Sequence, residues 1–393
     1  MKIKSIKQVG NLAGKRVLLR VDFNVPVKKG RILDDYKIRR GLATIQFLLK
    51  NKAKIILVTH LGRPLARKLT DERRKEYSLK PVATRLNKLL CQKVKFIPDI
   101  EGFEAATAAG KMKAGEIALL ENIRFVTGEK ENSRRLSKSL AQLADFYVND
   151  AFAVSHRKHA SVAAIKNYLP SFAGLLLAEE VVNLSRVFNG REPLVAVVGG
   201  VKIDTKLPLL KKLHRRAYRI LVGGALANNF LAARGFEIGR SVADEESVKL
   251  ARKIKYKNII LPVDAVVSHC RDGSQATVKP INRIIKLDYI YDIGPGTIRL
   301  YADFIRKAQT LIWNGPLGWF ENEKFKHGTL SIARLIAARS RGRAFGVVGG
   351  GETVEALRLT RSAGYVDWVS TGGGAMLSFL AGQPMPGLKG IVK

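Results

Sequence analysis

Short apolar runs rich in valine, isoleucine and leucine alternate with longer amphipathic stretches along the whole chain. In one such stretch, residues 38–49, apolar residues recur at helical spacing. Continuous apolar runs joined by helices are typical of parallel sheets covered on both faces. We therefore predict an α/β fold with two doubly wound parallel sheets. The predicted strands lie within residues 16–23, 54–61, 116–122 and 146–152 of the first half, and 194–200, 219–224, 258–267, 309–316 and 344–352 of the second.

The residues that follow the predicted strands differ between the two halves. Strands of the first half end in Asp, Asn, His and Arg, whereas those of the second half end in glycines. One sheet therefore offers charged side chains and the other offers bare backbone amides. A helical pattern follows Pro170, and a stiff helix there would let two domains move as rigid bodies about a central cleft. We predict a first domain over 1–169, a connecting helix over 170–190 and a second domain over 191–380.

The chain is strongly basic, with 69 Lys and Arg against 33 Asp and Glu and a formal net charge of +36. Such a charge favours the capture of anionic ligands. The cations are spread along the sequence, and aromatic residues are not interleaved with them as in surfaces that bind single strands. We therefore do not expect nucleic acid to be the main partner.

Two cysteines, Cys91 and Cys270, lie too far apart in sequence to form a local metal-ligand pair, and we predict that both are buried free thiols. The amino-terminal residues lack the apolar core of a signal peptide. No apolar run approaches the length that spans a bilayer. The sequence therefore predicts a cytoplasmic protein without a membrane partner.

A candidate phosphate site follows the apolar run Leu194–Val198. Gly199 and Gly200 end the run, and Lys202 and Lys206 come next. The spacing of the two lysines predicts that one helical turn presents both on one face, where an anion between them would relieve their repulsion. A solvated start of a helix is the alternative interpretation.

Polar side chains also follow four strands of the first half. Because the carboxyl ends of parallel strands meet at one sheet edge, we expect these side chains to share one pocket. Guanidinium groups match carboxylate and phosphate oxygens, which indicates a small phosphorylated hydroxy acid as the ligand. A single arginine at a strand end is more often part of a surface salt bridge, and only the recurrence of such residues after successive strands favours a pocket. The pocket residues are Asp22, Asn24, Arg39, His60, Arg63, Arg124 and Arg157.

Glycine-rich segments of the second half lie between predicted strands and helices, at Gly349–Thr353 and Thr371–Gly374. Free amides at helix starts bind phosphate. Gly223 and Gly224 would let a flat base approach the backbone. The Glu321 carboxylate suits hydrogen bonds from ribose hydroxyls. The alternative interpretation is a charge partner for the amino terminus of a helix. Neither the phosphate-loop spacing nor the dinucleotide fingerprint is present.

Nine motifs occur in an order that is similar to that of the phosphoglycerate kinase family: RVDFNVP, DDYKIR, THLGRP, ENIRF, NDAF with SHR, GGVKIDTK, WNGPLGWFE, VGGGET and STGGGA. The resemblance covers nearly the whole chain. It implies two Rossmann-like domains, with residues 381–393 returning to the first. It also implies reversible phosphoryl transfer from 1,3-bisphosphoglycerate to ADP, which gives 3-phosphoglycerate and ATP, in a monomeric enzyme.

The resemblance assigns the ligands to residues of this chain. It implies catalytic roles for Arg39, Lys202 and Gly373, and it places Mg²⁺ at Glu352. For 3-phosphoglycerate it implies Asp22, Phe23, Asn24, Arg39, His60, Leu61, Gly62, Arg63, Arg124 and Arg157. For the nucleotide it implies Gly200, Lys206, Gly223, Gly224, Tyr291, Asn314, Pro316, Glu321, Gly349, Gly350, Gly351, Glu352 and Thr353.

Some positions depart from the family pattern. Glu352 replaces a usual Asp, Ala153–Val154 replace Gly-Thr, Ile290 replaces a common glycine and Tyr291 replaces an aliphatic residue. The longer Glu side chain can still ligate Mg²⁺.

Neither direction of the predicted reaction removes a proton from the nucleophile, so a general base is not needed. We expect catalysis by domain closure, positioning and charge stabilisation. The alternatives are a nicotinamide-dependent oxidoreductase, which the missing fingerprint disfavours, and a basic nucleotide- or nucleic-acid-binding protein without kinase activity.

Overall fold

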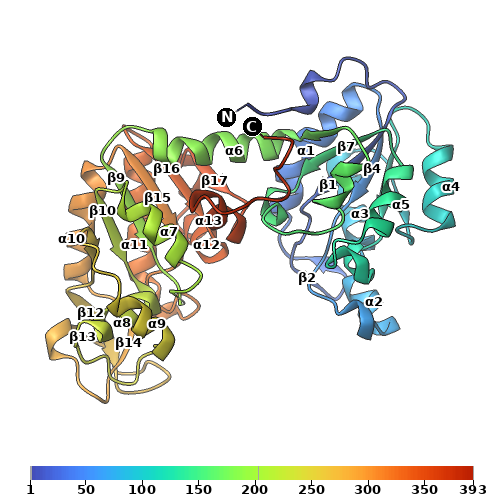
Figure 1. Ribbon diagram of the computed structural model, residues 1–393. Coiled ribbons are helices and arrows are strands. Elements are labelled where there is room, and N and C mark those ends of the chain that lie inside the picture. Colours follow the sequence, from blue (N-terminus) through green and yellow to red (C-terminus); the bar gives the residue numbers. More distant parts are fainter. Residues whose placement is uncertain (1, 202, 393) are drawn as a thin grey trace. The chain divides into compact units, whose positions relative to one another are not determined.

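The computed structural model describes residues 2–201 and 203–392 (Figure 1). The chain forms two compact units. The first comprises the residues up to Val182 together with the segment from Pro384 onwards, and the second comprises Asn183–Gln383. The division falls within helix α6 (Leu175–Asn189), inside the stretch predicted as the connector.

The first unit contains a six-stranded parallel sheet in the order β5-β6-β4-β1-β7-β8. Alternate residues of β1 face opposite cores, Val17 and Leu19 on one side and Leu18 on the other. Helices α1 and α3 cover the first face, and α4 and α5 cover the second. The strands are β1 (Arg16–Val21), β4 (Lys54–Val58), β5 (Val94–Ile97), β6 (Ile117–Leu120), β7 (Phe146–Asp150) and β8 (Ser171–Ala173), with a small antiparallel pair, β2 (Val27–Lys28) and β3 (Arg31–Ile32).

The helices of the first unit follow its strands as the alternating pattern predicts. The predicted helix at 38–49 is confirmed as α1, which is amphipathic and buries Ile38, Ile45 and Leu48. The α-helices are α1 (Tyr36–Lys50), α2 (Asp71–Tyr77), α3 (Lys80–Leu90), α4 (Phe103–Lys111) and α5 (Arg134–Gln142). Short 3-10 helices are η1 (Ile6–Gln8), η2 (Ala66–Lys68), η3 (Ile123–Phe125), η4 (Thr127–Glu129), η5 (Phe152–Val154) and η6 (Ala164–Asn167).

The second unit repeats this architecture with a parallel sheet in the order β11-β10-β9-β15-β16-β17. Its strands are β9 (Leu194–Val198), β10 (Arg219–Val222), β11 (Ile259–Ile260), β15 (Thr310–Asn314), β16 (Phe345–Gly349) and β17 (Trp368–Ser370). Its helices are α7 (Leu207–His214), α8 (Gly224–Ala233), α9 (Glu245–Arg252), α10 (Pro295–Lys307), α11 (His327–Ser340), α12 (Gly351–Leu359) and α13 (Gly374–Leu380), with 3-10 helices η7 (Ile281–Arg283), η8 (Glu323–Phe325) and η9 (Ala363–Tyr365). The prediction of two parallel α/β sheets is confirmed.

The predicted strand at 258–267 is wrong as a single element. It divides at Pro262 into β11, which joins the parallel sheet, and β12 (Asp264–Ser268), which leaves it. Proline has no N–H to donate to a strand ladder, which explains the break. β12 instead forms an antiparallel sheet with β13 (Thr277–Pro280) and β14 (Tyr289–Ile293).

The carboxyl-terminal segment packs on the first unit. The Lys4 amide donates to the Ile391 carbonyl at 2.8 Å, and Lys166 Nζ donates to the Lys389 carbonyl at 2.7 Å. A Cβ atom on Gly387 would lie 2.7 Å from Ser155 Cα, so this contact requires glycine. The segment therefore lies against the loop that follows β7.

The prediction of two buried thiols is wrong, because Cys91 is exposed and Cys270 is half-buried. Cys91 ends α3 in a left-handed conformation at the surface, so the apolar stretch before it does not decide its burial. Within residues 2–201 and 203–392, no helix has both the length and the apolar character to cross a bilayer.

We predict that Leu221→Ala lowers the free energy of unfolding of the second unit by about 2–5 kcal/mol, because it leaves a cavity. Leu221 lies in β10, is 0% exposed and belongs to the core that contains Trp313. All three tryptophans lie in the second unit, so their fluorescence in urea reports its unfolding. Leu359→Ala, at a half-exposed position on α12, is the control and should change little. Equal losses in both variants would contradict the assigned core.

Candidate functional site

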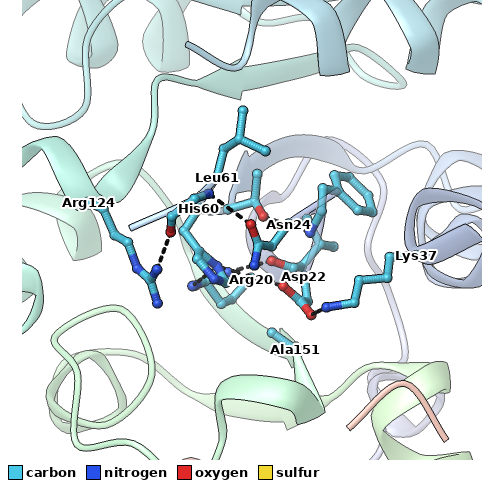
Figure 2. A network of polar contacts seen from close by, with 12 residues as sticks. Arg20, Asp22, Asn24, Lys37, His60, Leu61, Arg124 and Ala151 are labelled. Carbon is cyan, nitrogen blue, oxygen red and sulfur yellow. Dashed lines mark hydrogen bonds and ion pairs between the residues drawn. The ribbon is translucent and has the colours of Figure 1, made fainter. Parts of the chain in front are cut away.

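Polar side chains of the first unit gather at the carboxyl edge of its sheet. β6, β4, β1 and β7 are neighbours there, so the residues that follow them meet at one place, as predicted. Figure 2 shows Asp22, His60 and Arg124 converging from three of these strands.

Asp22 is the buried carboxylate of this cluster. Its Oδ2 accepts a hydrogen bond from Lys37 Nζ at 2.8 Å, and its Oδ1 lies 3.7 Å from His60 Nδ1. Burial opposes ionisation, but the charge and hydrogen bond of Lys37, together with the charge of Arg20, outweigh it and hold the pKa of Asp22 below its usual value. Oδ1 has no hydrogen-bond partner among the described residues and keeps its acceptor capacity.

His60 is a neutral imidazole. Burial lowers its pKa well below the usual value, and the cations Arg20 and Arg124 add to this effect against the opposing Asp22 carboxylate. Arg20 Nη2 lies 3.4 Å from His60 Nδ1. Because a guanidinium can only donate, Nδ1 is the acceptor in this contact and Nε2 carries the proton.

Arg20 is a member of the cluster that the sequence analysis missed. It is 1% exposed inside β1, and its Nε donates to Ser161 Oγ at 3.0 Å. Ser161 in turn donates through its amide and hydroxyl to Glu129, at 2.9 and 2.7 Å. Burial opposes the charge of Glu129, but His159 and Arg20 keep its pKa below the usual value. The signal in the sequence that could have revealed Arg20 is a charged residue inside an otherwise apolar predicted strand.

Arg63, Arg124 and Arg157 bring further positive charge to the same edge. Burial and the nearby Arg157 guanidinium lower the pKa of Arg124 to about 10. Burial and Arg63 likewise lower the pKa of Arg157. Arg124 also donates to the Gly62 carbonyl. The predicted pocket thus brings together cations that repel one another, and an anionic ligand would relieve this repulsion.

Arg39, another predicted residue of the pocket, lies on helix α1. It sits in the first turns of α1, is half-exposed and pairs through Nε with Asp35 at 2.9 Å. Asp35 also binds Arg85, so it holds two guanidinium groups. Within its unit, Arg39 is therefore already paired with a carboxylate.

The remaining predicted residues of the first unit shape its loops. The Phe23 amide donates to Thr59 Oγ1 at 2.9 Å, and Asn24 Oδ1 accepts from the Gly62 amide at 2.8 Å. Phe23 and Leu61 are buried. Gly62 has a φ of +63°, and a Cβ there would lie 2.3 Å from Tyr77, so this loop requires glycine. These residues fix the loops that carry His60 and Arg63.

The second unit contains a cavity of about 780 Å³ at the carboxyl edge of its sheet. Ile290, a departure from the family pattern, also lines it. Predicted nucleotide residues in its lining are Gly200, Lys206, Gly224, Tyr291, Asn314, Pro316, Glu321, Gly350 and Glu352. Gly349 and Thr353 support this lining, because the Gly349 carbonyl accepts from Asn314 Nδ2 at 2.6 Å and from Thr353 Oγ1 at 2.7 Å.

Lys206 is a buried lysine at this cavity. Burial lowers its pKa to about 8, although the Glu352 carboxylate opposes the shift. Its Nζ donates to Asn314 Oδ1. α7 begins at Leu207, directly after Lys206, and the predicted turn that presents both lysines on one face includes Lys202. Lys202 lies outside the described residues.

Glycines let two loops of the second unit approach closely. A Cβ on Gly199 would lie 1.9 Å from the Pro316 carbonyl oxygen. At Gly223 the space for a Cβ is filled by Leu317, which would lie 2.4 Å away. The glycine at 223 therefore serves packing between the two loops, and the approach of a base to its backbone stays a prediction. Gly224, with a φ of +66°, does line the cavity.

Two glycine-rich segments open helices, as predicted. Gly351 begins α12 after β16, and Gly374 begins α13 after β17. Gly350 and Gly373 precede these helices with φ angles of +111° and +49°. Both segments therefore present helix amino termini at the carboxyl edge of the sheet, where backbone amides suit phosphate oxygens.

Aromatic rings that the sequence analysis mostly missed form a wall beside the cavity. The ring of Tyr291 lies 4.6 Å from that of Phe325 and 5.3 Å from that of Trp319. Tyr289 stacks on Tyr291 at 5.7 Å. The Tyr291 hydroxyl donates to the Arg271 carbonyl at 2.8 Å, which fixes its ring. Only Tyr291 was singled out beforehand, since sequence spacing does not reveal this stack.

The family model described as phosphoglycerate kinase matches residues 6–383. The chain is 41% identical to the phosphoglycerate kinase of Pelotomaculum thermopropionicum over 99% of both chains, and 44% identical to that of Thermomicrobium roseum over 95% of both. Its fold is similar to the solved structure of phosphoglycerate kinase from Coxiella burnetii, with a TM-score of 0.86, 40% identity and coverage of 99% of this chain and 98% of that one.

These matches cover both compact units, and the fold and sequence comparisons agree. The chain therefore belongs to the phosphoglycerate kinase family and is an ATP-dependent phosphotransferase.

Proposed function

We propose that 3-phosphoglycerate binds to the cation cluster of the first unit. The observation that carries this proposal is the clustering of Arg63, Arg124 and Arg157. Burial and Arg157 lower the pKa of Arg124, and burial and Arg63 lower the pKa of Arg157. Guanidinium groups bind phosphate and carboxylate oxygens through paired hydrogen bonds. The open acceptor Asp22 Oδ1 suits the hydroxyl of the substrate, and the neutral His60 supplies an N–H donor.

The nucleotide then occupies the cavity of the second unit. Lys206 and the amides from Gly350 to Thr353 suit its phosphates, and Glu321 suits its ribose hydroxyls. Tyr291 and Ile290 line the cavity beside Gly224 and provide apolar contact for the base. The cavity volume of about 780 Å³ falls in the range of small-molecule sites.

Glu352 fits a magnesium ion that arrives with the nucleotide. Among residues 2–201 and 203–392 there is no group of three His, Cys, Asp or Glu side chains that could hold a metal ion. Glu352 lies in the first turn of α12 and lines the cavity. One carboxylate together with substrate phosphates is a common donor set for Mg²⁺. When bound, the ion neutralises phosphate charge.

The proposed reaction is direct phosphoryl transfer. The bond between phosphorus and the acyl oxygen breaks, a bond from phosphorus to the terminal oxygen of ADP forms, and the carboxylate leaves with the electron pair. Neither nucleophile must lose a proton, so no general base takes part. We assign charge stabilisation to Arg39, Lys202 and the amide of Gly373, by the resemblance to the family.

The two ligands bind to different units in this proposal. The first domain therefore binds 3-phosphoglycerate and the second binds the nucleotide, as the sequence predicts. Direct transfer between the two ligands requires the predicted closure of the domains. We further propose a monomer in the cytoplasm.

A coupled assay of ATP formation from 1,3-bisphosphoglycerate and ADP tests the reaction. The alternative function is that of a basic binding protein without kinase activity, which the net charge of +36 favours. Turnover that depends on both substrates supports the proposal, whereas nucleotide binding without turnover would leave only the alternative function.

We predict that Arg63→Ala raises KM for 3-phosphoglycerate by ~10–100-fold, because charged hydrogen bonds contribute ~1.5–3 kcal/mol. KM for ATP should stay the same. Steady-state kinetics with each substrate varied provide the measurement. Arg67→Ala removes a highly exposed arginine that pairs with Glu131 and should leave both constants unchanged. A normal KM for 3-phosphoglycerate in Arg63→Ala would remove Arg63 from the site.

We predict that ADP binding weakens as the pH rises above about 8, the pKa of Lys206 in the free protein. Lysine is charged below its pKa, so above it binding must take up a proton, and Kd should rise about tenfold per pH unit. Calorimetry in buffers of different ionisation enthalpy would detect this proton. Lys206→Arg should abolish the dependence, and Lys211→Arg should retain it. An unchanged pH profile in Lys206→Arg would assign the titration to another group.

We predict that Glu352→Gln weakens MgADP binding by roughly tenfold, because the amide is a poor ligand for a hard cation. Binding of ADP without metal should be unaffected. Glu355→Gln, one turn further along α12, is the matched control and should bind normally. Equal weakening with and without Mg²⁺ would show that Glu352 acts on the nucleotide rather than on the ion.

A further inference from the structure

Two segments of the second unit carry many cations and no acids. The sequence contains no Asp or Glu from Thr205 to Phe236 or from Ser247 to Val263. The structure places five Lys and Arg residues in 211–219 and four in 252–257, around the carboxyl ends of α7 and α9. We refer to residues 211–219 and 252–257 together as the basic-aromatic surface.

Tertiary contacts bring these two segments side by side. The rings of His214 and Tyr256 stack with centroids 3.9 Å apart and an interplanar angle of 7°. Asn258 Nδ2 donates to the carbonyls of His214 and Ala217, at 3.2 and 2.8 Å. The surface therefore forms one continuous patch that combines both sets of cations.

The patch lies at the amino ends of the strands, away from the nucleotide cavity of the same unit. Arg219 begins β10, and Ile259, which begins β11, pairs with Ile220. The cavity instead lies at the carboxyl ends of the strands, where Gly224, two residues after the end of β10, lines it. The proposed phosphoryl transfer therefore does not account for this patch.

Most of its cations are available to a ligand. Lys211, Arg215, Lys255 and Lys257 are exposed, and within residues 2–201 and 203–392 none of them forms an ion pair. Helix α10 contacts Tyr218 through Phe304, and its acid Asp303 is paired with Arg306. Favourable helix-terminal charge explains one or two cations at each helix end but not nine in two adjoining segments.

Tyr218 adds an aromatic surface to the patch. Its side chain is 42% exposed, with the Arg219 guanidinium 4.1 Å from the ring centroid and Phe304 packed edge-on. A cation beside an exposed ring is the arrangement on which unpaired bases stack next to their phosphates. A lipid surface would instead favour exposed aliphatic side chains, and an acidic protein has no need of a stacking ring.

We propose that the basic-aromatic surface binds a single-stranded polynucleotide, with the cations on the phosphates and Tyr218 on a base. This activity is separate from phosphoryl transfer and goes beyond the proposed function. The sequence spacing alone argued against such a surface, because Tyr256 and His214 meet only in the folded unit.

Fluorescence anisotropy with a labelled 20-nucleotide oligouridine tests the proposal on the full-length protein. The variant Lys211→Gln, Arg215→Gln, Lys255→Gln, Lys257→Gln removes four phosphate contacts. It should bind at least ~10-fold more weakly at 0.1 M salt, and the slope of log K against log salt should fall by about 3. The control Lys50→Gln, Arg73→Gln, Lys75→Gln, Lys138→Gln removes the same charge from exposed positions of the first unit. Equal losses in both variants would overturn the proposal in favour of overall charge.

Tyr218 separates base stacking from charge attraction. Tyr218→Ala should weaken oligouridine binding by ~5-fold or more, and Tyr218→Phe should restore it. Unchanged binding in Tyr218→Ala would overturn the assignment to single strands. Kinase turnover should remain normal in every variant, which verifies folding.

Two competitors complete the test. Saturating MgADP should leave oligouridine binding unchanged, and displacement by MgADP would place the polynucleotide in the nucleotide cavity and overturn the proposal. Vesicles with 30% phosphatidylserine should not compete, and surface-dependent vesicle binding without oligouridine binding would assign the surface to membranes instead.

Discussion

Repulsion between guanidinium groups at one sheet edge is the constraint on which the first unit depends. Burial lowers the pKa of both Arg124 and Arg157 there. Arg157 and Arg20 add to the effect at Arg124, and Arg63 and Arg20 add to it at Arg157. The fold offsets this repulsion with buried carboxylates. Asp22 and Glu129 stay ionised although burial opposes it, because the cations and hydrogen bonds around them favour the charged form. The remaining positive charge favours a bound anion.

The second unit has the same architecture, and in our proposal it binds a nucleotide. A nucleotide carries most of its charge on phosphates, and backbone amides at helix starts bind them without long cationic side chains. This requires loops that approach closely, and glycines at 199 and 315 make that approach possible. Lys206 is a buried cation at the cavity of this unit, and burial lowers its pKa to about 8.

Much of the fold followed from the hydrophobic pattern. The alternation of apolar runs and amphipathic stretches predicted both parallel sheets, and the helix at 38–49 was recognised from its spacing alone. The pattern failed at 258–267, where one apolar run contributes strands to two different sheets. A strand of either sheet is apolar here, so only Pro262 marks the division. It also failed for the thiols, since Cys91 follows the amphipathic helix α3 but lies on its exposed end.

The sequence by itself determined the fold class, the family and the strand-end residues of both units, because local periodicity and motif order are properties of the chain. Tertiary structure alone decided which of these residues meet. It joined Arg20 to Glu129 through Ser161, paired Arg85 with Asp35, and filled the space at Gly223 with Leu317. Such contacts join residues distant in sequence, so their geometry depends on sheet order and side-chain packing, which no local pattern specifies.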